Sequence, residues 1–294
     1  MSLPALRSFI EACRCGSLSD AARNLGLTQP AVSQHIASLE AQLGRPLFDR
    51  KPRGVTPTAF AHTFAAQIGD GLDKAEAALA AAKARSGQLS GAVHIAGPSE
   101  LMAARIAPHL AELQTAGLQI HLRPGGKSAI YQSLFDSNVD LAFTASSIDD
   151  PRLDCQKVGK EQLIAVASPQ VAARIAQGAS LAEGLQRASA AAYDTDMPLL
   201  RDWCALNRID AGQILPEITA PDLRMLCSLI IAGAGWSVVP DYLCQAALDS
   251  KKLVEIPAPV GVPENTFYLV WVKSALRHPR VAHARLLLLQ ALGG

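Results

Sequence analysis

The stretch Leu18–Glu40, LSDAARNLGLTQPAVSQHIASLE, has the pattern of two short helices separated by a tight turn. Ser19 is the expected N-cap of the first helix, whose small alanines allow a second helix to cross closely. Gly26 supplies the backbone freedom that the turn requires. Thr28 is a good N-cap for the second helix, and Pro30 in its first turn removes no needed hydrogen bond. The stretch therefore predicts a helix-turn-helix.

The second helix is predicted to bury one apolar side and to expose a neutral polar face. The apolar side consists of Val32, Ile36, Leu39 and Leu43. Glutamine can read adenine in the major groove, and serine and glutamine can hold phosphates, so a neutral face at a helix start suits DNA. The same pattern also fits a solvent-exposed face of a helical hairpin. The exposed face consists of Gln29, Ser33, Gln34 and His35.

The segment after this helix has the pattern of a β wing. Residues 46–57, PLFDRKPRGVTP, place apolar anchors around a turn that carries Arg50, Lys51 and Arg53. Such a turn brings cations to phosphates or into a minor groove. Residues 1–57 contain seven Lys and Arg against four Asp and Glu, so this part is mildly basic. The wing makes DNA binding the favoured function.

Residues 58–84 predict one long helix with a single apolar stripe. At about 1.5 Å per residue the helix spans ~40 Å, which is long for a globular domain, so its stripe needs a partner. We expect pairing with a second copy of the chain; the alternative is packing on the core of the same chain. The sequence SGQLSG at 86–91 then ends the helix and marks a domain boundary. The stripe consists of Phe60, Phe64, Ile68, Leu72, Ala75 and Leu79.

Strands and helices alternate in the order β-α-β-α-β twice beyond residue 91. We expect two doubly wound lobes joined by two crossing strands, with a ligand at strand ends between the lobes. The first set has strands at 92–96, 118–123 and 139–144, and helices at 101–114 and 128–136. The second has strands at 189–193, 214–218 and 236–239, and helices at 198–207 and 222–232. The crossing strands are expected at 162–167 and 266–272, and a closing helix at 279–292.

With these features the chain resembles the LysR-type transcriptional regulators over essentially its whole length. The resemblance implies a mixed fold: an N-terminal all-α winged helix-turn-helix with a long linker helix, and a C-terminal α/β two-lobe domain like a periplasmic binding protein. It places the DNA-binding domain at 1–57, the linker helix at 58–86 and the effector-binding domain at 91–294. Within the effector-binding domain, the resemblance assigns about 91–162 and 268–294 to the first lobe, and about 163–267 to the second lobe. The matching positions include Leu6, Phe9, Gly16-Ser17, Ala21-Ala22, Leu25, the run Thr28 to Ser33, Ile36, Leu39-Glu40, Leu43-Gly44, Leu47-Phe48, Arg50 and Thr58.

The resemblance also implies how the chain works and which residues contact its ligands. Such regulators bind double-stranded promoter or operator DNA as a homodimer or tetramer formed through the linker helix, and respond to a small-molecule effector. The implied DNA contacts are Thr28, Gln29, Pro30, Ser33, Gln34, His35, Arg50 and Arg53. The implied effector contacts are Ser99, Lys127, Ser128, Thr144, Ser146, Asp194 and Thr195.

The chemical class of the effector stays open between two possibilities. Hydroxyl groups and free amides at helix starts favour an anionic group such as a carboxylate. Asp194 and Asp196 do not fit a purely anionic ligand. If they face the cleft, they favour an amino-bearing ligand such as an amino acid; if they cap a helix, they say nothing about it.

Composition sets limits on location and cofactors. Net charge is +1, and the longest charge-free run, Met225–Pro240, is shorter than the roughly 20 apolar residues of a membrane helix, so we expect no membrane partner. Charged residues near the N-terminus disfavour a signal peptide, and six scattered cysteines indicate reduced thiols, so we expect a cytoplasmic protein. No metal-ligand spacing is present in the sequence, and no cofactor is expected.

Two other mechanisms fit single features of the sequence. Ser99 follows a strand as a hydrolase nucleophile would, but Leu101 replaces the last glycine of the G-x-S-x-G motif, so we expect no enzyme. Cys204 and Cys227 lie in the second lobe, where oxidant-sensing members of the family keep their cysteines. Without flanking cations these thiols are better explained as buried structural residues.

Overall fold

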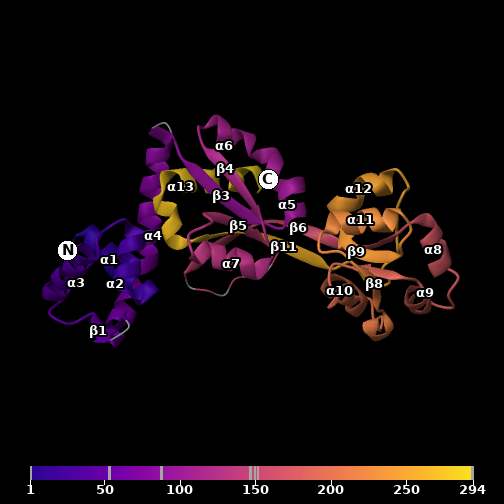
Figure 1. The fold of residues 1–294 in the computed structure, drawn as a ribbon, viewed down its shortest axis with the longest axis horizontal. Helices are drawn as coiled ribbons and strands as arrows, with labels where there is room; N and C mark the ends of the chain where they lie inside the picture. Colours follow the sequence, from indigo (N-terminus) through magenta and orange to yellow (C-terminus); the bar gives the residue numbers. More distant parts are fainter. Residues whose placement is uncertain are drawn as a thin grey trace. The chain divides into compact units, whose positions relative to one another are not determined.

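The computed structural model describes residues 2–51, 54–86, 89–145, 148, 150 and 152–292, and the side chains of 50, 81, 83–86 and 127 lie outside the description (Figure 1). The chain forms two compact units. The first is Met1–Gly87 with Lys273–Ala282, and the second is Gln88–Val272 with His283–Gly294. The segment 273–282, which the sequence-based boundaries place in the first lobe, thus packs with the N-terminal unit.

Helices of the N-terminal unit begin and end at residues suited to caps. Thr28 Oγ1 accepts a hydrogen bond from the Ala31 amide, as predicted. The N-cap of the preceding helix is Ser17 rather than Ser19, because the Ser17 hydroxyl accepts from the Asp20 amide at 3.2 Å. The elements are α1 Leu3–Cys15, α2 Leu18–Leu25, α3 Gln29–Leu43, β1 Phe48–Lys51, β2 Gly54–Pro57 and α4 Ala59–Ser86.

The long helix α4 packs its first half on the core of its own unit. Phe64 lies 5.4 Å from Phe9 between ring centroids, and Phe60, Ile68 and Leu72 join the same cluster. Farther along, Ala75 and Leu79 are exposed. The first half of the stripe therefore meets the packing alternative, and its second half is left uncovered in a single chain.

A sheet with β6 and β11 at its centre organises the second unit (Figure 1). Its order is β4-β3-β5-β11-β6-β9-β7-β8, and β10 also pairs with β6. We call β3 to β5 with their helices the first lobe, and β7 to β9 with theirs the second lobe. In each lobe these strands are parallel, whereas β6 and β11 are antiparallel to each other and run through both lobes. The two-lobe fold with two crossing strands is confirmed.

Bounds of the elements agree with many of the expected ones and differ at a few. The first lobe contains β3 Ala92–Gly97, α5 Ser99–Leu101, η1 Met102–Ile106, η2 Ala107–His109, α6 Ala111–Thr115, β4 Gln119–Pro124, α7 Lys127–Phe135 and β5 Leu141–Thr144. The second contains α8 Pro169–Ile175, α9 Leu181–Arg187, β7 Ala190–Ala192, α10 Pro198–Leu206, η3 Ala211–Gln213, β8 Pro216–Thr219, α11 Leu223–Ile231, β9 Trp236–Pro240, α12 Asp241–Asp249 and β10 Val254–Glu255. The remaining elements are β6 Leu153–Ala167, β11 Glu264–Val272, η4 Lys273–Arg277 and α13 Pro279–Leu292.

Two predicted elements differ in form. The helix expected at 101–114 is broken into short α, π and 3₁₀ turns, because Pro108 cannot donate a backbone hydrogen bond there. The first crossing strand starts at Leu153, nine residues before its predicted start at 162. Helices α8, α9 and α12 were not predicted.

Candidate DNA-binding surface and effector cavity

The start of α3 exposes the polar residues that the sequence predicts at DNA. Thr28, Gln29, Pro30 and Gln34 are exposed and Ser33 is half-buried, while Val32, Ile36 and Leu39 on the other side are buried. Gln29 Nε2 donates to Ser33 Oγ at 2.9 Å, so these two side chains lie together on the outer face. The arrangement presents amide and hydroxyl groups without charge at the helix N-terminus.

His35 has a different environment from the other predicted DNA contacts. It is half-buried, and its Nδ1 lies 2.8 Å from the hydroxyl of Ser8, which is fully buried in α1. This contact holds α3 against α1. The structure therefore gives one ring nitrogen of His35 a role inside the protein.

The wing is the hairpin of β1 and β2, and contacts from two sides fix it. Glu40 Oε1 accepts from the amides of Leu47 at 2.7 Å and Phe48 at 3.4 Å, which ties the end of α3 to the start of the hairpin. On the other strand, the Val55 amide donates to the Gly16 carbonyl at 3.0 Å. The side chains of Arg50 and Arg53, predicted at the DNA backbone, lie outside the described residues.

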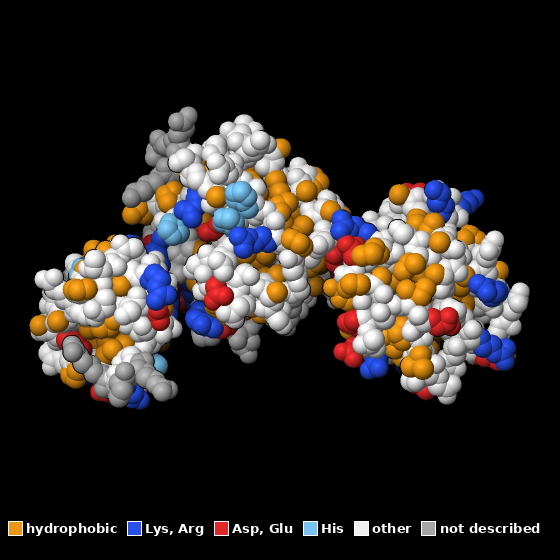
Figure 2. All heavy atoms as spheres, in the orientation of Figure 1, with side chains coloured by type: hydrophobic (Ala, Val, Ile, Leu, Met, Phe, Trp, Pro, Cys, Tyr) orange, Lys and Arg blue, Asp and Glu red, His pale blue; other side chains and the backbone are white. Residues whose placement is uncertain are grey.

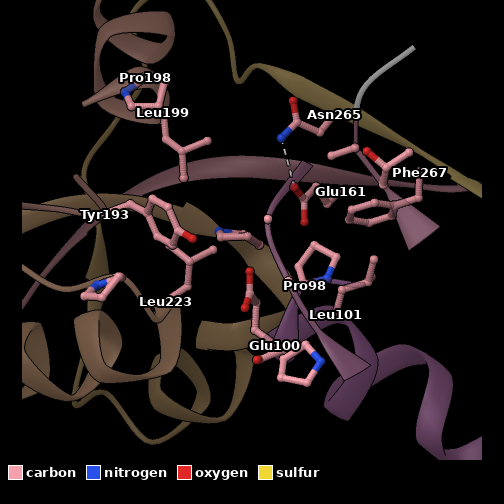
Figure 3. A pocket seen from close by; sticks show the side chains of 18 of the residues that line it. Pro98, Glu100, Leu101, Glu161, Tyr193, Pro198, Leu199, Leu223, Asn265 and Phe267 are labelled. Carbon is pink, nitrogen blue, oxygen red and sulfur yellow. Dashed lines mark hydrogen bonds between the residues drawn. The ribbon is translucent and has the colours of Figure 1, made fainter. Parts of the chain in front are cut away.

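A cavity of about 610 Å³ lies between the two lobes of the second unit (Figure 3). First-lobe residues come from the ends of β3, β4 and β5, and second-lobe residues come from the segments that follow β7, β8 and β9. Glu161 on β6 and Asn265 and Phe267 on β11 complete the lining. Strand ends meet helix starts here, which is where open α/β sheets bind ligands.

The structure brings three of the predicted effector contacts to this cavity. Ser99, Thr144 and Asp194 line it. Ser128 at the start of α7 and Thr195 in a surface turn are exposed and are not among the described lining residues. Ser146 and the side chain of Lys127 lie outside the described residues.

The two aspartates that left the ligand class open have different surroundings. Asp194 lines the cavity, and its Oδ1 also accepts from the Met197 amide at 2.8 Å, so it caps the turn that precedes α10. Asp196 is exposed and is not among the described lining residues. Asp194 thus meets both conditions set from the sequence, and the two aspartates do not by themselves decide between the ligand classes.

Sequence reasoning missed the most buried charged group of the cavity. Glu161 is 6% exposed, and its Oε1 accepts from Asn265 Nδ2 at 3.0 Å (Figure 3). Burial raises the pKa of Glu161 from 4.5 to about 7, and Asp241 and Glu100 act in the same direction, against Asn265 and Arg105. Burial also raises the pKa of Glu100. No spacing in the sequence marked Glu161, since its partner lies 104 residues away on another strand.

The cysteines of the second lobe are buried thiols. Burial raises the pKa of Cys204 to about 11. Cys227 lies 3.4 Å from Cys244, between the two sulfur atoms, and both are buried. These surroundings keep Cys204 and Cys244 protonated, whereas the hydrogen bond with Cys244 lowers the pKa of Cys227, and no Lys or Arg is among the causes of that shift.

Surface charge does not identify a ligand for the second unit. On the face drawn in Figure 2, its Lys and Arg side chains lie among Asp and Glu side chains rather than in a patch of one sign. Among the described residues, no group of three or more His, Cys, Asp and Glu is arranged to hold a metal ion. No helix within the described part of the chain is long and apolar enough to cross a membrane.

Comparisons with known proteins give the family. Residues 3–62 match the model for "Bacterial regulatory helix-turn-helix protein, lysR family", and residues 86–293 match the "LysR substrate binding domain". The HTH-type transcriptional regulator AbaB of Streptomyces antibioticus is 34% identical over 297 residues, which cover 97% of this chain and 96% of AbaB. The chain therefore belongs to the LysR family of transcriptional regulators, as its motifs indicated.

Solved structures share the same fold at lower sequence identity. CrgA, a LysR-type regulator from Neisseria meningitidis, matches with a TM-score of 0.61 at 22% identity and full coverage of both chains. Full-length LysG from Corynebacterium glutamicum, solved with its effector Arg, matches with a TM-score of 0.58 at 19% identity, over 97% of this chain and 98% of LysG. Both likenesses support the combination of a helix-turn-helix with a two-lobe regulatory domain.

Proposed function

We propose that this chain is a cytoplasmic regulator that binds operator DNA as a homodimer, with two dimers forming a tetramer, and that a small molecule in the cavity between the lobes controls it. The starts of two α3 helices enter successive major grooves of a two-fold symmetric site. The two wings contact the flanking backbone through Arg50 and Arg53. This geometry is the one that paired helix-turn-helix units use on DNA.

The exposed polar start of α3 is the observation that most directly supports binding to operator DNA. Gln29 and Gln34 are exposed while the opposite side of the helix is buried, so the helix is fixed on its unit with its amides facing outward. Glutamine amides can pair bidentately with adenine, and a neutral helix start is compatible with a nearby phosphate.

Dimer formation through α4 is supported by its second half. Ala75, Ala78 and Leu79 are exposed in a single chain and lie on one side of the helix at spacings of three and four residues. Two such helices side by side would cover these residues. The doubled DNA-binding unit then doubles the number of DNA contacts.

Control by the cavity is supported by the way the lobes are connected. Among the described residues, β6 and β11 are the strands that run through both lobes. A ligand that contacts both lobes would therefore favour one distance between the lobes. A change in the distance between the lobes would alter the arrangement of two dimers bound to DNA. Catalysis has no comparable support, since Leu101 stands where the G-x-S-x-G motif has its last glycine.

The test is a nuclease footprint on the DNA upstream of the chain's own gene, together with binding to that DNA and to random DNA. The variant Gln29→Ala removes an amide at the start of α3, and Gln42→Ala makes the same change at the exposed end of the same helix. We expect Gln29→Ala to lose about 1–3 kcal/mol of preference for the specific site, and Gln42→Ala to lose none.

Equal losses for both glutamine variants on specific and random DNA would contradict a recognition role for the start of α3. A footprint that is present in the wild type and unchanged in Gln29→Ala would do the same. Protection over two half-sites related by a dyad would support the dimer.

A further inference from the structure

The cavity between the lobes is acidic. Its described lining contains the carboxylates of Glu100, Glu161 and Asp194, and it contains no Lys, Arg or His. Asp194 is engaged by the Met197 amide, which leaves Glu100 and Glu161 as the carboxylates that face the cavity (Figure 3). A lone carboxylate ligand would therefore meet like charge.

Glu161 lacks a cation of its own. It is more than nine-tenths buried, its one described hydrogen bond comes from the neutral amide of Asn265, and no Lys or Arg lies within ion-pair distance of it among the described residues. The nearby Arg105 is held on the ring of Tyr242, 5.0 Å from its centroid, and lines a neighbouring cavity instead. A buried carboxylate without a cation is costly, so above about pH 7, where Glu161 is ionised, a cation at this point would be favoured.

Glu100 is in a similar position on the first lobe. It belongs to the short turn after β3, and burial disfavours its charged form. Arg224 of the second lobe favours the charged form of Glu100, but it is paired with Asp222 at 2.6 Å, and Asp222 acts on Glu100 in the opposite direction. Glu100 and Glu161 thus face one space, and within the part of the chain that the structure describes neither forms an ion pair with a Lys or Arg.

We propose that the effector of this regulator is a small organic cation, bearing an ammonium or guanidinium group that pairs with Glu161 and Glu100. The proposal rests on the proposed function, since it names the ligand class of the same cavity. Of the two classes that the sequence leaves open, the structure favours the amino-bearing one, through residues that the sequence did not single out.

The rest of the lining indicates a carbon skeleton rather than a metal ion. Leu101, Leu199 and Leu223 form apolar walls from both lobes, and the rings of Tyr193 and Phe267 border the same space. Apolar walls bind a carbon chain, and aromatic faces attract a cation. The described carboxylates are not grouped as a metal site requires.

The test measures binding to the full chain by calorimetry and thermal shift at pH 8, without DNA. The probes are matched in skeleton: phenethylamine, 3-phenylpropanoate and 2-phenylethanol, with agmatine and L-arginine as guanidinium compounds. We expect the amine or a guanidinium compound to bind and to raise the melting temperature, and the carboxylate and the alcohol to have no effect at the same millimolar concentration.

Substitutions of the two carboxylates test whether they supply the affinity for the cation. Glu161→Gln keeps the size of the side chain and the acceptor for Asn265 but removes the charge, so cation affinity should fall by at least about tenfold. Glu100→Gln should weaken it in the same direction. The control Glu217→Gln makes the same change on exposed β8, outside the cavity, and should bind as the wild type does.

Two results would overturn the proposal. In the first, 3-phenylpropanoate binds equally to the wild type and to Glu161→Gln; in the second, no amine or guanidinium compound binds. Its failure is separable from failure of the proposed function. A footprint with no cation binding would leave the regulator and remove the ligand class. Cation binding that Glu161→Gln abolishes, in a chain that protects no DNA, would keep the ligand site and contradict the proposed DNA-binding role.

Discussion

Burial of Glu161 disfavours the ionised form of its carboxyl group. Its ordinary pKa is 4.5 and burial raises the pKa to about 7 in the folded chain. Below pH 4.5 the group is protonated in both folded and unfolded chains, so stability is unaffected. As the pH rises from 4.5 to 7, the unfolded chain gives up this proton first, and the folded state loses stability relative to it.

Replacing Glu161 with glutamine should therefore stabilise the ligand-free protein at alkaline pH. The gap between 4.5 and about 7 corresponds to at most about 3 kcal/mol of unfolding free energy, which glutamine recovers because it never ionises. We expect Glu161→Gln to melt a few degrees higher than the wild type at pH 8 and at the same temperature at pH 4.5, measured by differential scanning calorimetry.

Glu217→Gln, at an exposed position, should melt as the wild type does at both pH values. If Glu161→Gln melted lower at pH 8, the carboxylate would have to be stabilised by its surroundings. That result would remove the reason for a cation in the cavity.

How far the site was predictable also depends on single residues. Ser99 comes just after β3 and Thr144 is the last residue of β5, so their place at the cavity follows from the strand order alone. Glu161 and Asn265 are directly opposite each other on β6 and β11, and only the register of these strands brings them together. Local pattern carries no information about a pairing between such distant segments.

At the scale of elements, helices with clear caps and apolar periodicity were predicted well. The closing helix α13 was expected at its observed bounds, 279–292, and α3 begins where Thr28 caps it. The first part of β6 was missed because residues 154–157 are all exposed and read as a loop, and their strand form comes from pairing with β11. Tertiary pairing overrides local pattern there.

The two halves of the apolar stripe on helix α4 have different surroundings. Its first half packs on Phe9 and its neighbours, whereas Leu79 is 53% exposed in a single chain. A leucine this exposed on a helix end, next to exposed alanines, fits a face covered by a second copy.

Placing a charge at this position should weaken the dimer. We expect Leu79→Glu to shift the protein toward monomer in size-exclusion chromatography with light scattering, with unchanged folding of the monomer by circular dichroism. Burying an unpaired carboxylate at an interface costs several kcal/mol, enough to raise the dissociation constant by a factor of about a hundred or more.

Ala66→Glu adds the same charge at an exposed position on another side of α4 and should leave the dimer intact. A dimer that persists in Leu79→Glu at low concentration would place the interface elsewhere.

At the scale of the whole chain, strand β11 of the second unit is followed directly by η4, which belongs to the first unit. Strand β11 gives Asn265 and Phe267 to the cavity and continues directly into η4, which packs in the first unit. There Arg277 lies 3.5 Å from Glu11 on α1 and 3.9 Å from Glu76 on α4, measured between nitrogen and oxygen. Glu11 also accepts from Asn24 of α2 at 2.9 Å, so the contacts of Arg277 reach the helix-turn-helix.

Arg277 should therefore matter far more to the first unit than its neighbour Lys273. Its side chain is 14% exposed, and removing its charge leaves Glu11 and Glu76 buried with less compensation. We expect Arg277→Gln to cost about 3–5 kcal/mol, read as a lower melting temperature and faster hydrogen exchange in α1 and α4. Lys273→Gln breaks only a surface pair with Asp70 and should cost less than about 1 kcal/mol.

A second substitution distinguishes an electrostatic cause from a loss of packing. Arg7 also pairs with Glu76, so the carboxylate left least compensated in Arg277→Gln is Glu11. Adding Glu11→Gln removes that charge while keeping an acceptor for Asn24, and should recover part of the lost stability. If the double variant were less stable than Arg277→Gln by the full cost of Glu11→Gln alone, the two residues would be energetically independent, and the buried charges would not be what holds η4 to α1.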